Sequence, residues 1–112
     1  EHALVDIITE ARLIVKHISN VDISTFYEDE KAQSLAIHRL MIIGEAVKRL
    51  SDDFRNAHPE IPWKDMAGMR DKLIHEYHIV DLDDVWETAV IDIPNVSFLF
   101  TSDFSFLSHQ SH

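Results

Sequence analysis

The sequence of 112 residues contains no cysteine, only two glycines and no apolar run long enough to cross a membrane. Without cysteine, neither a disulfide framework nor a thiolate metal site can form, as is common in proteins of a reducing cytosol. A membrane-spanning helix needs roughly 20 apolar residues in succession. No basic segment precedes an apolar one, so no signal peptide is expected. We therefore predict a cytoplasmic protein with no membrane segment.

Positive charge is missing from the last third of the chain. All ten Lys and Arg residues lie between Arg12 and Lys72, only acids follow among the charged residues, and the formal net charge is -10. Proteins that coat nucleic acid depend on many basic side chains that neutralise phosphates, so this class is excluded. Any nucleic-acid chemistry must take place in a local basic cleft. The acidic C-terminal part could instead face a basic protein partner.

Apolar residues recur with the spacing of amphipathic helices in the first half of the chain. They predict a helix over residues 4–18, a short turn capped by Ser24 or Thr25, and a long helix over residues 29–50. Gly44 lies inside the long helix, where glycine costs about 1 kcal/mol relative to alanine. We therefore expect a close crossing of two helices at Gly44.

The second half begins with a connector over residues 54–63, whose two prolines exclude a continuous helix. A helix is expected to run through residue 69 to about residue 77. Asp81 is expected to cap a further helix over residues 82–93, with a break or a new first turn at Pro94.

These patterns predict an all-α protein, an up-and-down bundle of four to five helices. The bundle is expected to occupy residues 1–96. Residues 97–112 combine four phenylalanines with several serines and show no helical periodicity. They are expected to be an atypical, irregular or disordered tail.

Chemically reactive side chains are concentrated in residues 68–77. This segment places the cation Arg70, the carboxylate Asp71, the imidazole His75 and the phenol Tyr77 within less than three helical turns. The order Arg-x4-His-x-Tyr resembles the motif of the HEPN superfamily, in particular its HepT-like branch. The similarity extends over most of the chain, from residue 4 to about residue 94. Further segments that resemble this family are 29–33, 42–46, 58–63 and 80–86.

The resemblance implies a HEPN-like bundle that forms a two-fold homodimer, with the two Arg-x4-His motifs facing one another across a cleft. It implies a metal-independent endoribonuclease with no cofactor, the toxin of a type VII-like toxin–antitoxin pair that cleaves RNA. The antitoxin partner would be a nucleotidyltransferase of the MntA type, which transfers AMP from ATP to the motif tyrosine, here Tyr77. Two features depart from the family: Asp71 stands where relatives often carry Asn, and residues 97–112 replace a Lys/Glu-rich last helix.

The motif suits RNA cleavage because it offers a proton carrier and a fixed cation. An imidazole such as His75 can be base or acid near neutral pH, and Arg70 can stabilise charge on a phosphate. Tyr77 lies seven positions from Arg70 and therefore on the same side of the predicted helix, whereas His75 is rotated from Arg70 by roughly 140° around the helix axis. We therefore expect each chain to hold half a site, which a dimer completes. Asp71 and Glu45 are expected to support this site.

Each assignment has a plainer alternative. Arg70 could form a structural ion pair with Glu45 or Asp71, and His75 could be an ordinary hydrogen-bonded helix residue. Tyr77 could be a half-buried aromatic, and Glu45 a solvated acid. A metal site is not expected, because His75 and its neighbour three residues on lack a third ligand at suitable spacing.

The outer basic residues and the whole protein also have alternatives. Lys48, Arg49 and Arg55 could extend a phosphate track, although a solvated face is favoured. The protein as a whole could instead be a non-catalytic nucleotide- or substrate-binding subunit of a nucleotidyltransferase complex, or a purely structural helical dimer.

Overall fold

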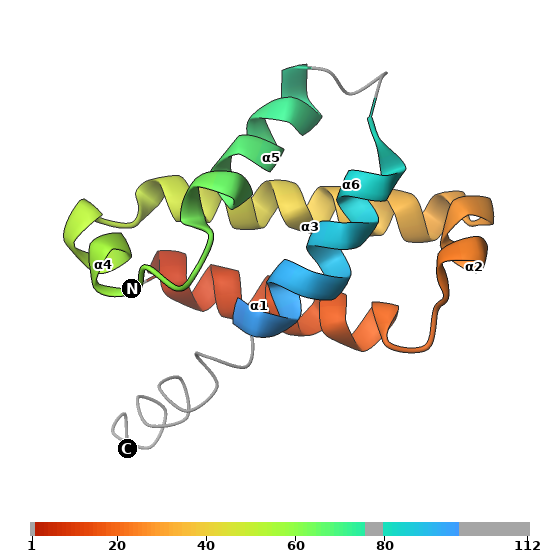
Figure 1. The fold of residues 1–112 in the computed structure, drawn as a ribbon, viewed down its shortest axis with the longest axis horizontal. Coiled ribbons are helices and arrows are strands. Elements are labelled where there is room, and N and C mark those ends of the chain that lie inside the picture. Colours follow the sequence, from red (N-terminus) through yellow and green to blue (C-terminus); the bar gives the residue numbers. More distant parts are fainter. Residues whose placement is uncertain (1, 76–79, 97–112) are drawn as a thin grey trace.

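A computed structural model of the chain describes residues 2–75 and 80–96 (Figure 1). The described part is all-α, as predicted, and contains no strand. None of its helices is long and apolar enough to cross a membrane. Its elements are α1 (His2–Ile18), α2 (Ile23–Glu28), α3 (Glu30–Arg49), α4 (Asp52–Ala57), α5 (Trp63–His75), α6 (Leu82–Glu87) and the wider π-helical turn η2 (Thr88–Asp92).

The two long helices, α1 and α3, run antiparallel along the longest axis of the molecule (Figure 1). α5 crosses α3, and the helix that begins with α6 crosses both long helices. The apolar stripes of all these helices meet in one core, whose fully buried side chains include Ile7, Phe26, Ile43 and Val85. The predicted helical bundle is therefore confirmed.

Side-chain caps determine where several helices begin. Asp29 accepts hydrogen bonds from two backbone N–H groups of the next turn at 3.0 and 3.2 Å, so α3 begins where predicted. Asp81 caps α6, also as predicted. The prediction for α2 was wrong: Asp22, rather than Ser24 or Thr25, is the cap, and it accepts from the backbone N–H of Thr25 at 2.8 Å.

The connector before α5 is shorter than predicted, because residues Asp52–Ala57 form the helix α4, capped by Ser51. Trp63 fixes the end of the connector to this helix. Its indole N–H donates to the backbone carbonyls of Arg55 and His58 at 3.1 and 3.0 Å, and the residue is buried. This contact holds the first turn of α5, the helix that carries the predicted site.

The last described helix continues past Pro94, where a break or a new first turn was predicted. The N–H of Ile93 bonds to the carbonyl of Thr88, five residues back, and residues 93–96 are helical again. A proline has no N–H and crowds the carbonyl four residues earlier, and the wider π-turn before Pro94 gives that ring more room. The prediction for residues 97–112 lies outside the described residues and stays a prediction.

Candidate functional site

The candidate site is built on the crossing of α3 and α5. A Cβ atom added at Gly44 of α3 would lie 2.3 Å from the Cβ of Arg70 and 2.9 Å from the carbonyl oxygen of Met66 on α5. No larger residue fits without moving one helix away from the other. The close crossing predicted at Gly44 is confirmed, and it brings the backbone of Arg70 directly against α3.

The guanidinium of Arg70 is held by two carboxylates. One terminal nitrogen lies 2.8 Å from Glu45, the residue after Gly44, and the other lies 3.0 Å from Asp71. The Nε atom is buried and has no hydrogen bond within the described part of the chain. Arg70 is thus contacted by acids from two helices, and its side chain keeps 25% of its surface exposed. The ion pairs that were weighed as the plainer alternative are both present.

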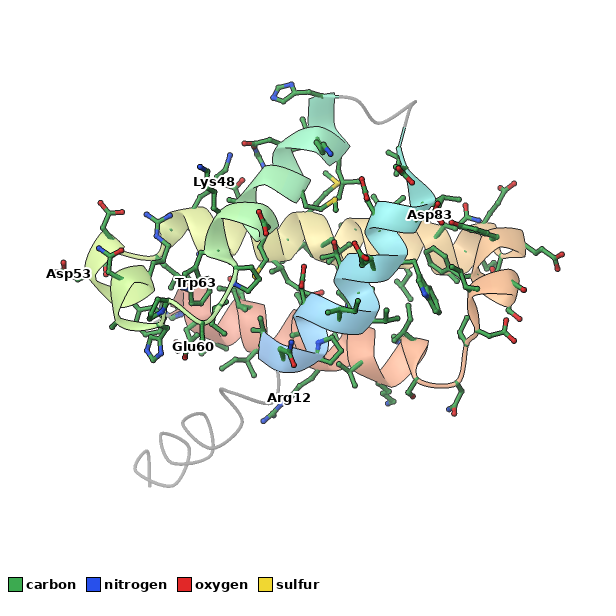
Figure 2. All side chains as sticks on the ribbon, viewed as in Figure 1. Arg12, Lys48, Asp53, Glu60, Trp63 and Asp83 are labelled. Atoms are coloured by element: carbon green, nitrogen blue, oxygen red, sulfur yellow. The ribbon has the colours of Figure 1, made fainter. Side chains whose placement is uncertain are left out.

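Lys48 completes the cluster from α3. Figure 2 labels Lys48 on this helix. Its ammonium group contacts Asp71, which is also the partner of Arg70. The hydrogen bond from Lys48, followed by that from Arg70, lowers the pKa of the Asp71 carboxyl. Asp71 therefore stays ionised at neutral pH, and two cations face two carboxylates. Lys48 is exposed, as the favoured solvated role implies, and it also forms an ion pair with a residue of another helix.

His75 lies apart from this cluster. It is the last residue of α5 and is exposed. It lies five positions from Arg70, which corresponds to about 7.5 Å along the helix and roughly 140° around it. No hydrogen bond or ion pair within residues 2–75 and 80–96 joins His75 to Arg70, Glu45 or Asp71. The structure therefore brings together the predicted cation and its supporting acids, and leaves the imidazole at another edge of the helix.

Tyr77 lies outside the described residues, so its predicted place beside Arg70 stays a prediction. Among the residues that are described, no three His, Cys, Asp or Glu side chains are arranged to hold a metal ion. The chemistry that the cluster itself can offer is anion binding. A guanidinium and an ammonium lie close together, and each can exchange a carboxylate for a phosphate oxygen.

Comparison with known proteins identifies the family. The family model described as "Ribonuclease HepT-like" matches residues 7–99. The chain belongs to the HepT-like ribonuclease family. The resemblance that the motif indicated is thus confirmed. The HEPN-like class of the all-α fold is confirmed as well, and so is the enzyme class, which is endoribonuclease. No solved structure matches the chain.

Several relatives share this similarity over most of their length. "Probable ribonuclease HepT" of Thermococcus cleftensis is 44% identical over 97 residues, which cover 87% of this chain and 88% of the relative. A protein of Methanocaldococcus jannaschii with a provisional RNase name is 39% identical over 92 residues, 82% of this chain and 76% of the relative. A similarly named protein of Caldanaerobacter subterraneus subsp. tengcongensis is 40% identical over 90 residues, 80% of each chain.

Proposed function

We propose that this ribonuclease is the toxin of a type VII-like toxin–antitoxin pair and cleaves RNA without a metal ion, using Arg70 and His75 at a two-fold dimer cleft. The observation that supports this most is the placement of Arg70 over Gly44. A guanidinium is a planar cation that can donate to two phosphate oxygens at once.

The proposed reaction is an internal phosphoryl transfer. The 2'-hydroxyl oxygen bonds to phosphorus while the bond to the 5'-oxygen breaks, which leaves a cyclic phosphate and a 5'-hydroxyl. His75 of one copy takes the 2'-hydroxyl proton, and His75 of a second copy gives a proton to the departing 5'-oxygen. Arg70 donates to the phosphate oxygens, and these bonds strengthen as negative charge develops.

A second copy is required because the reaction needs two proton carriers, and in the described part of one chain His75 is the single imidazole of the motif and lies apart from Arg70. A helix of a second copy that faces this edge of α5 would meet His75. A two-fold homodimer would bring both imidazoles and both guanidinium groups to one cleft.

Phosphate binding must compete with the acids that already hold Arg70. Glu45 and Asp71 are 53% and 45% exposed, so water screens both ion pairs with Arg70 and each contributes little free energy. A multivalent RNA backbone can displace partners this weak. We propose that the two acids hold the guanidinium in position until RNA enters.

Neutralisation by the antitoxin is proposed to act on Tyr77. A nucleotidyltransferase of the MntA type would move AMP from ATP to the phenol oxygen, with release of pyrophosphate. The added anion would compete with RNA phosphate for Arg70. Co-expression with such a transferase is expected to add AMP mass to the peptide that contains Tyr77. An unmodified peptide in the presence of an active transferase and ATP would refute this step.

The ion pairs of Arg70 also favour a second candidate function. An arginine held by two acids is the arrangement expected of a structural position, so the chain could be a non-catalytic nucleotide- or substrate-binding subunit of a nucleotidyltransferase complex.

The deciding experiment compares RNA cleavage and cell growth for the wild type, His75→Ala, and the double variant Arg70→Ala, His75→Ala. Arg49→Ala is the matched control, because Arg49 pairs with Asp6 on the surface at 2.8 Å. Loss of cleavage and toxicity in both site variants, but not in the control, supports the nuclease. Cleavage that persists in the double variant refutes the assigned residues, and an inactive wild type that binds a transferase favours the subunit.

A further inference from the structure

A cavity of about 280 Å³ lies at the end of the molecule where α2 meets the two long helices (Figure 1). Its walls come from the C-terminal end of α1, the N-terminal half of α3 and the segment around Phe26 in α2. We call it the α2 cavity. None of the described residues that line it belongs to the cluster around Arg70, and His75 is not among them either. The α2 cavity is therefore separate from the candidate ribonuclease site.

Small residues of α3 leave the space that the α2 cavity occupies. Ala32 and Ala36 are four residues apart, so they lie on the same side of α3, and both line the cavity. Their side chains end at Cβ, whereas a leucine at either position would extend into this space. The other apolar side chains that line the cavity are larger: Ile14, Ile18, Val21, Phe26 and Leu35. The interior is therefore suited to an apolar ligand.

The apolar lining extends from the core to the surface. Phe26 is fully buried, and Leu35 is 37% exposed. A ligand that covers Leu35 and contacts Phe26 would remove apolar surface from water, which is a main source of affinity in pockets of this kind.

Basic side chains lie beside the apolar lining. Lys31, Leu35 and Arg39 follow one another at a spacing of four residues, so the two cations lie on either side of Leu35 along α3. His17 of α1 also lines the cavity and is exposed. Neither Lys31 nor His17 forms an ion pair within residues 2–75 and 80–96. Both side chains are therefore available to an acidic ligand.

Arg39 has a donor that none of the described residues accepts. One terminal nitrogen of its guanidinium donates to Glu10 at 2.9 Å, and the side chain is 18% exposed. The Nε atom is buried and forms no hydrogen bond within the described part of the chain. A buried N–H group without an acceptor costs free energy, and an anionic oxygen that reached it would remove this cost.

Asp29 is the acid among the described residues that line the cavity, and its charge is already engaged. One of its carboxylate oxygens accepts from the backbone N–H groups of Lys31 and Ala32 at 3.0 and 3.2 Å, which caps α3. The basic residues Lys31, Arg39 and His17 outnumber it, and within the described part of the chain only Arg39 has an acidic partner of its own. This balance favours an anion in the cavity.

The size and the lining of the cavity select the kind of anion. Ligand pockets measure about 300–1,000 Å³, so the α2 cavity suits a small molecule rather than a segment of a protein. RNA and nucleotides carry sugar hydroxyls and base edges that need polar partners, which apolar walls do not offer. A compact apolar body with a single acidic group matches both the interior and the basic side chains.

We propose that the α2 cavity binds a small amphipathic acid. Its apolar body lies against Ala32, Leu35 and Phe26. Its carboxylate or sulfonate group contacts Lys31 and Arg39. The proposal is independent of the ribonuclease mechanism, because no catalytic group of that mechanism lines the cavity.

The test compares two fluorescent probes that share one aromatic body. Anilinonaphthalene sulfonate carries an acidic group, and phenylnaphthylamine lacks it. Both become fluorescent in apolar surroundings, so their binding to the full chain is measured by titration. We expect both probes to bind the wild type and decanoate to displace them. Displacement by AMP but not by decanoate would overturn the proposal.

A double variant tests the basic side chains. His17→Gln with Lys31→Gln is expected to weaken binding of the sulfonate probe about fivefold, the equivalent of about 1 kcal/mol, and to leave binding of phenylnaphthylamine unchanged. The matched control is His2→Gln with Lys64→Gln, two exposed residues of the same types that do not line the cavity. It is expected to weaken binding of the sulfonate probe less than about twofold. Equal weakening by both double variants would show that the probe responds to net charge and would overturn the proposal.

A further variant tests the cavity without changing charge. Ala32→Leu places an apolar side chain in the space, and leucine is nearly as good a helix former as alanine. We expect binding of both probes to weaken more than about tenfold, while thermal unfolding and RNA cleavage stay at wild-type levels. Full binding of either probe by a folded Ala32→Leu variant would place the probe elsewhere on the molecule and would refute the assignment.

Discussion

At the scale of single residues, the candidate site is electrically balanced rather than basic. Arg70 and Lys48 are offset by Glu45 and Asp71, all within one cluster of ion pairs. The chain carries a net charge of -10, so general attraction of RNA is not available to it. In the proposed mechanism, affinity arises from replacing carboxylates by phosphates at this one position, and the acids would then be determinants of RNA binding.

Substitution of Glu45 tests this competition directly. Glu45→Gln keeps the shape of the side chain but removes one of the charges that hold Arg70. We expect RNA to bind about two- to fivefold more tightly, as follows from an ion pair worth about 0.4–1 kcal/mol. Binding is best measured with the His75→Ala background, which is expected not to cut the RNA. Weaker binding in Glu45→Gln would mean that Glu45 itself positions the guanidinium for phosphate.

Two aspartates are expected to give opposite pH effects on stability. The pKa of Asp71 is lowered below its ordinary value of 3.8, chiefly by the hydrogen bond from Lys48. The ionised carboxylate therefore adds to the free energy of unfolding above pH 3.8, and this contribution disappears only as the pH falls through the lower pKa of the folded state. The pKa of Asp92 is raised above 3.8 by burial of its carboxyl and by the negative charges of Asp65 and Glu87. Its ionised form therefore lowers the free energy of unfolding, and this destabilisation fades as the pH falls toward 3.8 and the carboxyl becomes protonated.

Urea unfolding of Asp71→Asn and Asp92→Asn at about pH 7 and about pH 4 checks both signs. At the higher pH we expect Asp71→Asn to be less stable than wild type and Asp92→Asn more stable. At the lower pH the destabilisation of Asp71→Asn should persist, and the stabilisation of Asp92→Asn should shrink. A constant difference at both values for Asp92→Asn would contradict the raised pKa.

At the scale of helices, the sequence predicted most of the fold, and the misses have local physical causes. Apolar residues at helical spacing predicted α1, and together with the capping aspartates at residues 29 and 81 they predicted α3 and α6. The short helix α4 has six residues and no buried one, so it leaves no apolar stripe to detect. The helix past Pro94 persists because of the π-turn, and hydrophobic spacing does not indicate a change of turn width.

The residues of the candidate site were proposed from the sequence, and most of their contacts become visible only in the structure. The position of Gly44 in the long helix predicted a helix crossing, but the structure is needed to identify Arg70 as the residue opposite it. The pairing of Lys48 with Asp71 joins residues 23 positions apart, so it depends on the packing of α3 against α5. The separation of His75 follows from helix geometry and could be stated from spacing alone.

The two glycines provide a matched pair for this crossing. Gly44→Ala places a methyl group 2.3 Å from the Cβ of Arg70, and overpacking of this kind costs about 1–3 kcal/mol. Gly68→Ala meets open space inside α5 and should stabilise the helix by about 0.5–1 kcal/mol. Chemical denaturation of both variants checks the contrast. If Gly44→Ala were as stable as wild type, α5 would have to shift from α3 at little cost, and RNA cleavage would then report whether Arg70 moved with it.

At the scale of the whole molecule, the proposed mechanism depends on two copies sharing one cleft. If both imidazoles serve one reaction, a dimer with a single His75→Ala chain is inactive. Equal amounts of wild type and His75→Ala, mixed and allowed to exchange subunits, form about one quarter wild-type dimers by random pairing. Cleavage is then expected at about a quarter of the rate of the same total amount of wild type. A rate near one half would mean that each chain carries a complete site of its own. Arg49→Ala mixed in the same proportion is the control and should leave the rate unchanged, because among the described residues Arg49 pairs with Asp6 on the surface, away from Arg70 and His75.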